Sequence, residues 1–270
     1  MIEPILIAFS VVTLVGLVAG VLLALASYFL EVKEDETVKR VRECLPGVNC
    51  GACGYTGCDE YAKAVAEGSA KANLCIPGAD QTAIEISKVL GVEAEDVVEM
   101  IAFVGCNVTC DATSKIFQYN GVNSCAGASM IYGGPNACNY GCLGCGDCAN
   151  VCPQNAICTK DGIARINGDI CIGCGLCANV CPKNIIKLIP RISKVSVMCN
   201  NKEKGGIARK KCKNACIGCK KCELGCPEKA ITVNDNLAVI DYSKCTGCGL
   251  CAENCPTGCI KTFMLDEYAN

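Results

Sequence analysis

The chain has 270 residues and a net charge of only −2, with 5% aromatic residues and no tryptophan. Large aromatic side chains therefore cannot be the main source of core stability. The chain also contains no histidine, which excludes histidine-ligated haem, Rieske centres and zinc sites built on imidazole. Cysteine is abundant instead, at 29 residues. Bound metal can supply the missing stability, because binding free energy at a structural metal site is also folding free energy.

The first predicted element is a transmembrane helix over residues 4–30, a segment without any charged residue. Its length exceeds the roughly 20 residues needed to cross the hydrocarbon core. A cleaved signal peptide is the alternative, but Glu3 replaces the usual basic region and no A-x-A cleavage site follows. Basic residues occur only after the helix, which predicts a single-pass protein of the inner (cytoplasmic) membrane with its cysteine-rich domains on the cytoplasmic side. These residues are Lys33, Lys39, Arg40 and Arg42.

A charged linker or juxtamembrane helix is expected over residues 31–43, followed by a four-cysteine domain over 44–95. Cys50, Cys53 and Cys58 have C-x2-C-x4-C spacing, and Cys75 follows the helical-looking stretch 59–72. A second helix is predicted from an Asp80 cap to Gly91. Nearby glycines allow the backbone to wrap closely around a metal group. We expect the four cysteines to bind one [4Fe-4S] cluster.

The linking segment 96–138 contains a predicted buried strand, VVEMIAFVGC, and then a Gly- and Asn-rich stretch typical of loops. It contains four more cysteines at long and irregular intervals. A further cluster is predicted on Cys106, Cys110, Cys125 and Cys138.

Twenty of the cysteines fall into two sets of ten that superpose with a constant offset of 74 residues. Within each set the run C-x2-C-x2-C-x3-C-P occurs twice. This spacing is typical of ferredoxins with two cubane clusters, in which the fourth cysteine of each run binds the other cluster. The runs are Cys142, Cys145, Cys148 and Cys152; Cys171, Cys174, Cys177 and Cys181; Cys216, Cys219, Cys222 and Cys226; and Cys245, Cys248, Cys251 and Cys255.

The crossed arrangement predicts two ferredoxin-like units, over residues 139–190 and 213–265, joined by a linker over 191–212. Each unit contains a hairpin signal between its two runs: AICT and IARI in the first, AITV and LAVI in the second. The fold class is therefore α+β, with one N-terminal transmembrane helix, a small helical 4Fe-4S domain and tandem two-cluster units. Six [4Fe-4S] clusters are expected, and at least four.

Disulfides and zinc are the competing explanations for so many cysteines. Closely spaced triplets crowd sulfur atoms around a metal instead of pairing them at a distance, which opposes disulfides. All-cysteine zinc ribbons use paired C-x-x-C units separated by a long gap, a pattern that these triplets do not have. Three cysteines without an assigned partner are expected to be buried free thiols that behave as small apolar groups. They are Cys44, Cys158 and Cys259.

The leading pair of each ten-cysteine set leaves one question open. Cys199 and Cys212 match Cys125 and Cys138 by the offset of 74, but nothing upstream in the second copy matches Cys106 and Cys110. Either the second copy has lost a cluster, or the four repeated cysteines share one. Cys138 and Cys142 are also close enough in sequence to exchange roles.

Positive charge is concentrated between Lys183 and Lys229, where thirteen Lys or Arg residues accompany three Glu. The lysines either offset the negative charge of clusters and thiolates or form a docking face for an acidic redox carrier. If the lysines form a docking face, charge reversal at three of them should slow reduction by the carrier at low salt. These residues are Lys210, Lys211 and Lys213. No nucleic-acid-binding motif accompanies the charge, so a nucleic-acid partner is not expected.

A membrane helix, the segment LPGVNCGACGYTGC and tandem ferredoxin units together resemble the B subunit of the Rnf complex, over essentially the whole chain. The resemblance implies a component of a membrane ferredoxin:NAD oxidoreductase coupled to sodium or proton transport. It implies that this component receives electrons from soluble reduced ferredoxin and assembles with other membrane and peripheral subunits. By resemblance, Cys50, Cys53, Cys58 and Cys75 match the family's four-cysteine cluster domain.

No G-x-G-x-x-G follows a predicted strand, so the nicotinamide and flavin sites are expected on other subunits. No residue is predicted to perform acid–base or nucleophilic catalysis, and the expected mechanism is one-electron hopping between clusters. A membrane-tethered electron donor to a different oxidoreductase or redox regulator is the alternative function. A structural or regulatory metal protein without redox activity is the third.

Overall fold

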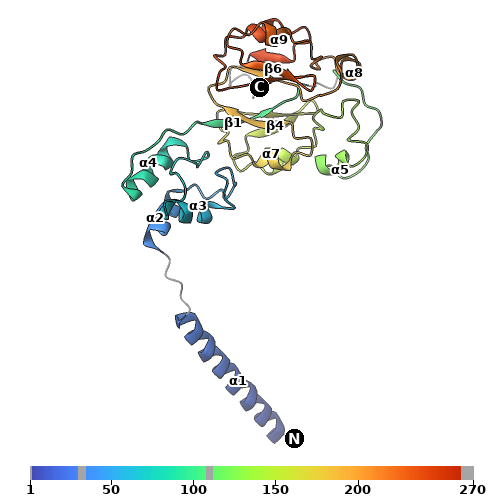
Figure 1. Ribbon diagram of the computed structural model, residues 1–270. Helices are drawn as coiled ribbons and strands as arrows, with labels where there is room; N and C mark the ends of the chain where they lie inside the picture. Colours follow the sequence, from blue (N-terminus) through green and yellow to red (C-terminus); the bar gives the residue numbers. More distant parts are fainter. Residues whose placement is uncertain (1, 30–34, 108–111, 263–270) are drawn as a thin grey trace.

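The structure is a computed structural model that describes residues 2–29, 35–107 and 112–262. It consists of a long N-terminal helix, a small helical module and two ferredoxin units packed together (Figure 1). Helix α1 (Ile2–Phe29) stands apart from the remainder, and the side chains of its segment Phe9–Ala26 are exposed. Among the described residues it is the one helix whose length and composition would allow it to cross a membrane. The predicted apolar helix is therefore present.

The helical module contains α2 (Glu36–Cys44), α3 (Cys58–Ala66) and α4 (Ala79–Leu90). Its core is formed by Val41, Tyr61, Val65 and Ile86, each almost fully buried. Of the two expectations for residues 31–43, the structure has the helix from Glu36 onward, and α2 contributes Val41 to this core. Amphipathic packing fixes α2 despite its high charge.

The helix ends depart from the sequence expectation at two places. Helix α3 ends at Ala66 because Gly68 adopts a positive φ of +73°, which terminates the predicted helix over 59–72. Asp80 is not the cap of α4; its carboxylate accepts a hydrogen bond from the backbone N–H of Val97 at 2.8 Å. Helix α4 ends at Gly91 in the left-handed conformation, as predicted.

Each ferredoxin unit is built from two two-stranded antiparallel sheets. In the first unit, β1 (Met100–Val104) pairs with β4 (Ile186–Pro190), and β2 (Ile157–Lys160) pairs with β3 (Ile163–Ile166). In the second unit, β5 (Val195–Val197) pairs with β8 (Ile260–Thr262), and β6 (Ile231–Asn234) pairs with β7 (Leu237–Ile240). Both hairpins expected from the sequence are present.

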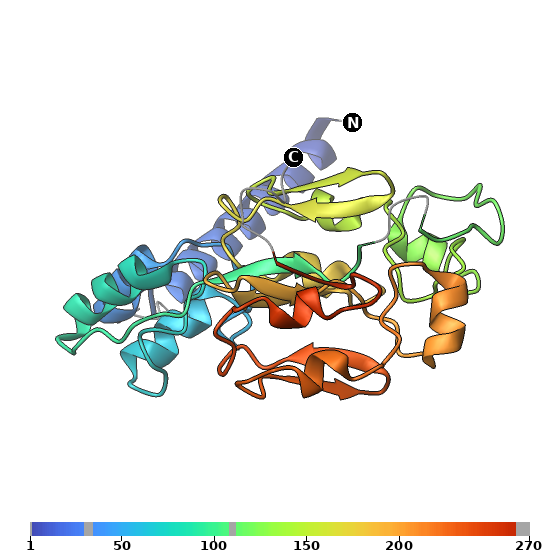
Figure 2. The same ribbon diagram turned by 90° about the horizontal axis from the view of Figure 1, so that it is seen from above.

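Short helices lie between the strands of both units. They are α6 (Asp147–Asn150) and α7 (Leu176–Val180) in the first unit, and α9 (Lys221–Leu224) and α10 (Leu250–Glu253) in the second. The two hairpins lie on opposite outer sides of the pair, with the other strands between them (Figure 2). Helices α5 (Cys125–Ser129) and α8 (Gly205–Lys211) lie on the side away from the helical module (Figures 1 and 2).

The strand register identifies the true counterparts in the two units. Val104 pairs with Ile186, and Val197 pairs with Ile260, a residue 74 positions after Ile186. Val104 is therefore the counterpart of Val197, and Cys106 is the counterpart of Cys199. This corrects the expectation that Cys125 matches Cys199. The offset fails here because Cys106 and Cys138 are 32 positions apart, whereas Cys199 and Cys212 are only 13 positions apart.

Candidate iron–sulfur centres

The helical module brings together Cys50, Cys53, Cys58 and Cys75. Cys58 begins α3, and Cys75 is buried beneath α3 and α4. Burial, together with the charges of Cys58, Cys50 and Cys53, raises the pKa of the Cys75 thiol to about 11. Four sulfur atoms that influence one another in this way can hold one iron–sulfur cluster.

The loop before α3 has the backbone conformation that such a site needs. Gly51 and Gly54 adopt positive φ values of +73° and +89°, which side chains with a Cβ rarely tolerate. The side chain of Asn49 accepts a hydrogen bond from the backbone N–H of Cys58 at 2.8 Å. The loop is therefore fixed at both ends of the C-x2-C-x4-C segment.

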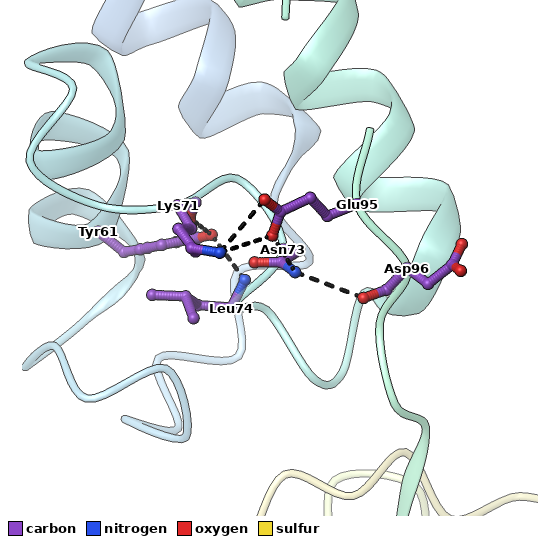
Figure 3. Close-up of polar contacts among 6 residues, drawn as sticks. All are labelled: Tyr61, Lys71, Asn73, Leu74, Glu95 and Asp96. Carbon is purple, nitrogen blue, oxygen red and sulfur yellow. Dashed lines mark hydrogen bonds and ion pairs between the residues drawn. The ribbon is translucent and has the colours of Figure 1, made fainter. Parts of the chain in front are cut away.

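A buried tyrosine positions the segment that leads to Cys75 (Figure 3). The Tyr61 hydroxyl donates to the carbonyl of Lys71 at 2.8 Å and accepts from the backbone N–H of Leu74 at 3.2 Å. Glu95 adds an outer layer by accepting from the side chains of Lys71 at 2.9 Å and Asn73 at 3.0 Å. The Tyr61 side chain on α3 thus fixes the position of the segment that directly precedes Cys75.

We predict that Tyr61→Phe destabilises the module by about 1–3 kcal/mol, because the carbonyl of Lys71 and the N–H of Leu74 lose their buried partner. Anaerobic urea unfolding monitored by circular dichroism would measure the change. The cluster of this module should also be lost more readily to a chelator. Tyr55→Phe is the matched control, since the Tyr55 ring lies 5.5 Å from that of Tyr61 but its hydroxyl makes none of these contacts. Equal effects of both substitutions would contradict the positioning role.

In each ferredoxin unit the cysteines surround cavities of similar size. The cavities measure about 350 Å³ in the first unit, and about 300 and 360 Å³ in the second. Each contains the fourth cysteine of the other run, as the crossed pattern expects. The lining cysteines are Cys142, Cys148 and Cys181 with Cys125; Cys216, Cys219, Cys222 and Cys255 with Cys259; and Cys226, Cys245, Cys248 and Cys251.

The fourth ferredoxin-type group consists of Cys152, Cys171, Cys174 and Cys177. Burial raises the pKa of Cys174, and the charges of Cys50, Cys171 and Cys152 raise it as well. Burial also raises the pKa of Cys177 to about 12, followed by the charges of Cys171, Cys174 and Cys148. Cys174 thus lies near Cys50 in the helical module, and Cys177 near Cys148 in the neighbouring group.

Glycine or asparagine occupies the positive-φ positions around these groups, with two exceptions. The residue after the second cysteine of each run is Gly146, Gly175 or Gly249 in three runs, but Lys220 at φ +61° in the fourth. The third residue after the last cysteine is Asn155, Asn184 or Gly258 in three runs, but Lys229 at φ +49°. Comparison of the four runs could have revealed both lysines from the sequence.

Cys125 is not placed with Cys106 and Cys138, as the sequence predicted, but beside Cys142, Cys145 and Cys148. The reason is Asp147, whose carboxylate accepts hydrogen bonds from the Ser124 hydroxyl at 3.0 Å and the Ala126 N–H at 3.1 Å. These bonds hold α5, and Cys125 with it, against the Cys142 group. Cys110 lies outside the described residues.

The three unassigned cysteines have different environments. Cys158 is exposed on β2, and Cys44 is half-buried and donates to the carbonyl of Arg40 at 3.3 Å. The expectation of buried thiols is therefore wrong for these two. Cys259 is buried, as expected, and its sulfur lies 3.5 Å from that of Cys255. This contact lowers the pKa of Cys255 to about 4.

The cysteine groups do not have the geometry of single-ion sites. Within the described part of the chain, no three His, Cys, Asp or Glu side chains converge closely enough to hold one metal ion. A zinc ion would draw its sulfur ligands to about 2.3 Å from the metal. The cysteines instead line the cavities described above, which suit multi-iron clusters better.

Comparison with known proteins finds iron–sulfur family models over the segments that contain these cysteine groups. Residues 45–77 match the family model described as "Putative Fe-S cluster", and residues 141–185 and 215–259 match the "4Fe-4S dicluster domain". A second dicluster model matches residues 170–231.

Full-length relatives extend the match to nearly the whole chain. The chain is 41% identical over 96% of its length to the B subunit of the Na(+)-translocating ferredoxin:NAD(+) oxidoreductase complex of Acetobacterium woodii, covering 78% of that protein. It is 43% identical over 94% of its length to the B subunit of the proton-translocating ferredoxin:NAD(+) oxidoreductase complex of Clostridium ljungdahlii, covering 91% of it. The chain belongs to this B-subunit family.

The family also includes the B subunit of the ion-translocating oxidoreductase complex of Methanosarcina acetivorans, 36% identical over 91% of the chain and covering 94% of that protein. Membership of the family confirms the resemblance drawn from the sequence. With tandem 4Fe-4S domains and one apolar N-terminal helix, the chain is an electron-transfer protein of that family.

Proposed function

We propose that the chain accepts electrons from reduced ferredoxin and passes them through iron–sulfur clusters towards NAD(+) within a membrane complex. Partner subunits of that complex translocate sodium ions or protons and hold the nicotinamide site. The observation that carries this proposal is the continuity of the cysteine groups: thiols of one group influence the pKa of thiols in the next, within the first ferredoxin unit and from it to the helical module. The relatives from Acetobacterium woodii and Clostridium ljungdahlii are named as subunits of ferredoxin:NAD(+) oxidoreductase complexes.

Five of the proposed clusters follow from the cysteine groups described above. The ligand sets are Cys50, Cys53, Cys58 and Cys75; Cys142, Cys145, Cys148 and Cys181; Cys171, Cys174, Cys177 and Cys152; Cys216, Cys219, Cys222 and Cys255; and Cys245, Cys248, Cys251 and Cys226. Bound there, [4Fe-4S] clusters supply one-electron carriers whose potentials depend on hydrogen bonds and solvent exposure. The protein contributes their spacing, burial and hydrogen-bond donors.

The second ferredoxin unit is the proposed entry point for electrons. Cys219 and Cys248 are exposed there, whereas the corresponding residues of the first unit are more covered. An exposed cluster edge lets a soluble carrier approach closely. The helical module, at the other end of the cysteine series and joined in sequence to α1, is the proposed exit towards membrane partners. We place these domains on the cytoplasmic side, because basic residues follow the apolar helix.

The surface beside Cys219 has the properties of a docking site for an acidic carrier. Lys220, Lys221 and Lys229 are exposed around α9, and Leu224 between them is 85% exposed. Lys220 and Lys229 occupy positive-φ positions at which the other runs have Gly or Asn. A strained residue at a functional site suggests that its side chain is needed there. Lys220 lies 3.9 Å from the Glu223 carboxylate, whereas Lys211, one of the residues favoured from the sequence, is paired more closely with Glu203 at 2.5 Å.

We predict that the double variant Lys220→Gly/Lys229→Asn lowers the rate of reduction by ferredoxin about tenfold at low salt, because electrostatic steering is lost. The difference should shrink as salt screens the charges. Stability should not fall, and relief of left-handed strain should raise the free energy of unfolding by up to about 1 kcal/mol.

Stopped-flow absorbance under anaerobic conditions measures the rate, and urea unfolding measures the stability. Lys160→Gly, which removes an exposed lysine from β2 of the first unit, is the control for charge loss alone. An unchanged rate in the double variant would reject this surface as the docking site. Failure of reduced ferredoxin to reduce the fully loaded wild-type chain would reject ferredoxin as the donor.

A further inference from the structure

A cavity of about 270 Å³ lies between the two ferredoxin units and is lined by four cysteines that belong to none of the five sets above. Its size is close to that of the smallest cavity among the ferredoxin-type groups. Each unit contributes two of the cysteines, and none is more than 9% exposed. They are Cys106 and Cys138 from the first unit, and Cys199 and Cys212 from the second.

The two halves of this site are equivalent by strand register. Cys106 lies two residues beyond the end of β1, and Cys199 lies two residues beyond the end of β5. Backbone bonds repeat as well: Gly105 N–H donates to the Ile185 carbonyl and Met198 N–H to the Cys259 carbonyl, both at 2.7 Å. Cys138 and Cys212 each precede the first cysteine of a run by four positions. The duplication therefore supplies both pairs.

The sulfur atoms of the site accept hydrogen bonds as thiolates would. The N–H of Cys142 donates to the sulfur of Cys106 at 3.4 Å, and the N–H of Cys216 donates to the sulfur of Cys199 at 3.3 Å. The side chain of Asn201, only 1% exposed, donates through Nδ2 to the sulfur of Cys138 at 3.6 Å. Such donors stabilise negative charge on metal-bound sulfur.

Hydrogen bonds between the units hold the walls of the site together. Lys213 N–H donates to the carbonyl of Ala112 at 2.9 Å, and the Thr113 hydroxyl donates to the carbonyl of Lys211 at 2.7 Å. The side chain of Asn214 donates to the carbonyl of Asn107 at 3.0 Å. These contacts connect the chain after Cys106 to the chain around Cys212, so the cavity is a defined part of the fold.

We infer that Cys106, Cys138, Cys199 and Cys212 hold a [4Fe-4S] cluster that bridges the two ferredoxin units. The site answers the question left open by the sequence: the leading cysteines of the two copies share one cluster, with Cys106 in the place expected of Cys125. A single metal ion fits less well, because among the described residues no three such ligands converge on one point.

The bridging cluster completes the electron route. The sulfur of Cys106 accepts from the backbone N–H of Cys142, and the sulfur of Cys199 accepts from that of Cys216. The bridging cluster therefore lies beside a cluster ligand of the first unit and beside one of the second. One electron passes from the Cys216 cluster to the bridging cluster and then to the Cys142 cluster, each donor being oxidised as its acceptor is reduced. No bond or proton is exchanged. This inference rests on the proposed iron–sulfur loading, and not on the identity of the electron donor.

Iron and sulfide analysis of the full-length chain, purified anaerobically, tests the site. The wild type should contain about 24 iron atoms, four in each of six clusters. Cys199→Ala and Cys212→Ala should each lose about four iron atoms together with one reductive EPR signal. Cys158→Ala, at an exposed cysteine outside all groups, should retain the full content. Wild-type iron content in Cys199→Ala and Cys212→Ala would overturn the inference, as would about 20 iron atoms in the wild type.

Asn201→Leu provides a test that keeps all four cysteines, in case their replacement prevents folding. Removing the Nδ2 donor from Cys138 should shift one cluster signal to lower potential and leave the other five unchanged in an EPR redox titration. No shift at full iron content would contradict the site. A chain with about 24 iron atoms that ferredoxin cannot reduce would reject the proposed donor but leave the bridging cluster standing.

Discussion

Replacing Gly173 by alanine should destabilise the chain and slow electron transfer into the helical module, whereas the same change at Gly247 should have a mild effect. Gly173 lies between Cys171 and Cys174 at φ +66°, and a Cβ there would be 2.3 Å from the carbonyl oxygen of Met100. It would also be 3.1 Å from the side chain of Ile76, the residue after Cys75. Gly173 therefore marks the place where the first ferredoxin unit and the helical module approach each other.

Gly247 is the equivalent residue 74 positions later and separates the two effects. Its φ is +73°, and the nearest atom to a Cβ there would be the Cβ of Lys194 at 3.2 Å, a much milder contact than that of Gly173 with a backbone carbonyl. Both substitutions introduce left-handed strain of about 1–2 kcal/mol. Gly173→Ala adds overpacking against backbone, which costs a further amount of about 1–3 kcal/mol. Its total effect on the free energy of unfolding should therefore be roughly twice that of Gly247→Ala.

Two measurements distinguish a local defect from a broken junction. Anaerobic urea unfolding compares the stabilities of the two variants. Freeze-quench EPR after rapid reduction compares how quickly electrons reach the cluster of the helical module. Gly173→Ala should delay reduction of that cluster while the second unit is reduced at the normal rate. Equal behaviour of the two variants would show that the contact with Met100 and Ile76 does not set the distance between the clusters.

Local signals in the sequence predicted much of this fold. Uninterrupted hydrophobicity predicted α1, paired strand-like segments between the cysteine runs predicted both hairpins, and Gly91 predicted the end of α4. The four cysteine runs are also recognisable locally, because binding to a cubane cluster requires this spacing between neighbouring cysteines. Each of these features is determined by neighbouring residues.

The sequence-based predictions were wrong where packing between distant parts of the chain determines the structure. A constant offset of 74 assigns Cys199 to Cys125, because it cannot show that β1 pairs with β4 and β5 with β8. The capture of α5 by Asp147 leaves no spacing signal in the sequence. The many charged residues of α2 conceal its place in the core of the helical module, which depends on the burial of Val41. In each case a contact distant in sequence overrides the local pattern.

Removal of iron should unfold both ferredoxin units but leave much of the helical module folded. In the two units, buried cysteines and short-strand residues form the cores together, among them Cys148, Cys177 and Cys222. Burial raises the pKa of the first two thiols to about 12 and that of Cys222 to about 11. Without metal, these three thiols are neutral, and nothing replaces the bonds to iron around the cavities.

The helical module depends less on metal, because Val41, Tyr61 and Ile86 pack together without it. Hydrogen exchange on the chain before and after anaerobic chelation should therefore give two different results. Amides of the strand pairs β1–β4 and β5–β8 should lose nearly all protection, because the binding free energy that is removed exceeds the stability of an ordinary domain of about 5–15 kcal/mol. Amides within α3 and α4 should keep most of theirs. Retained protection in the strands would mean that apolar packing alone stabilises these units. Cluster binding would then contribute little to their folding.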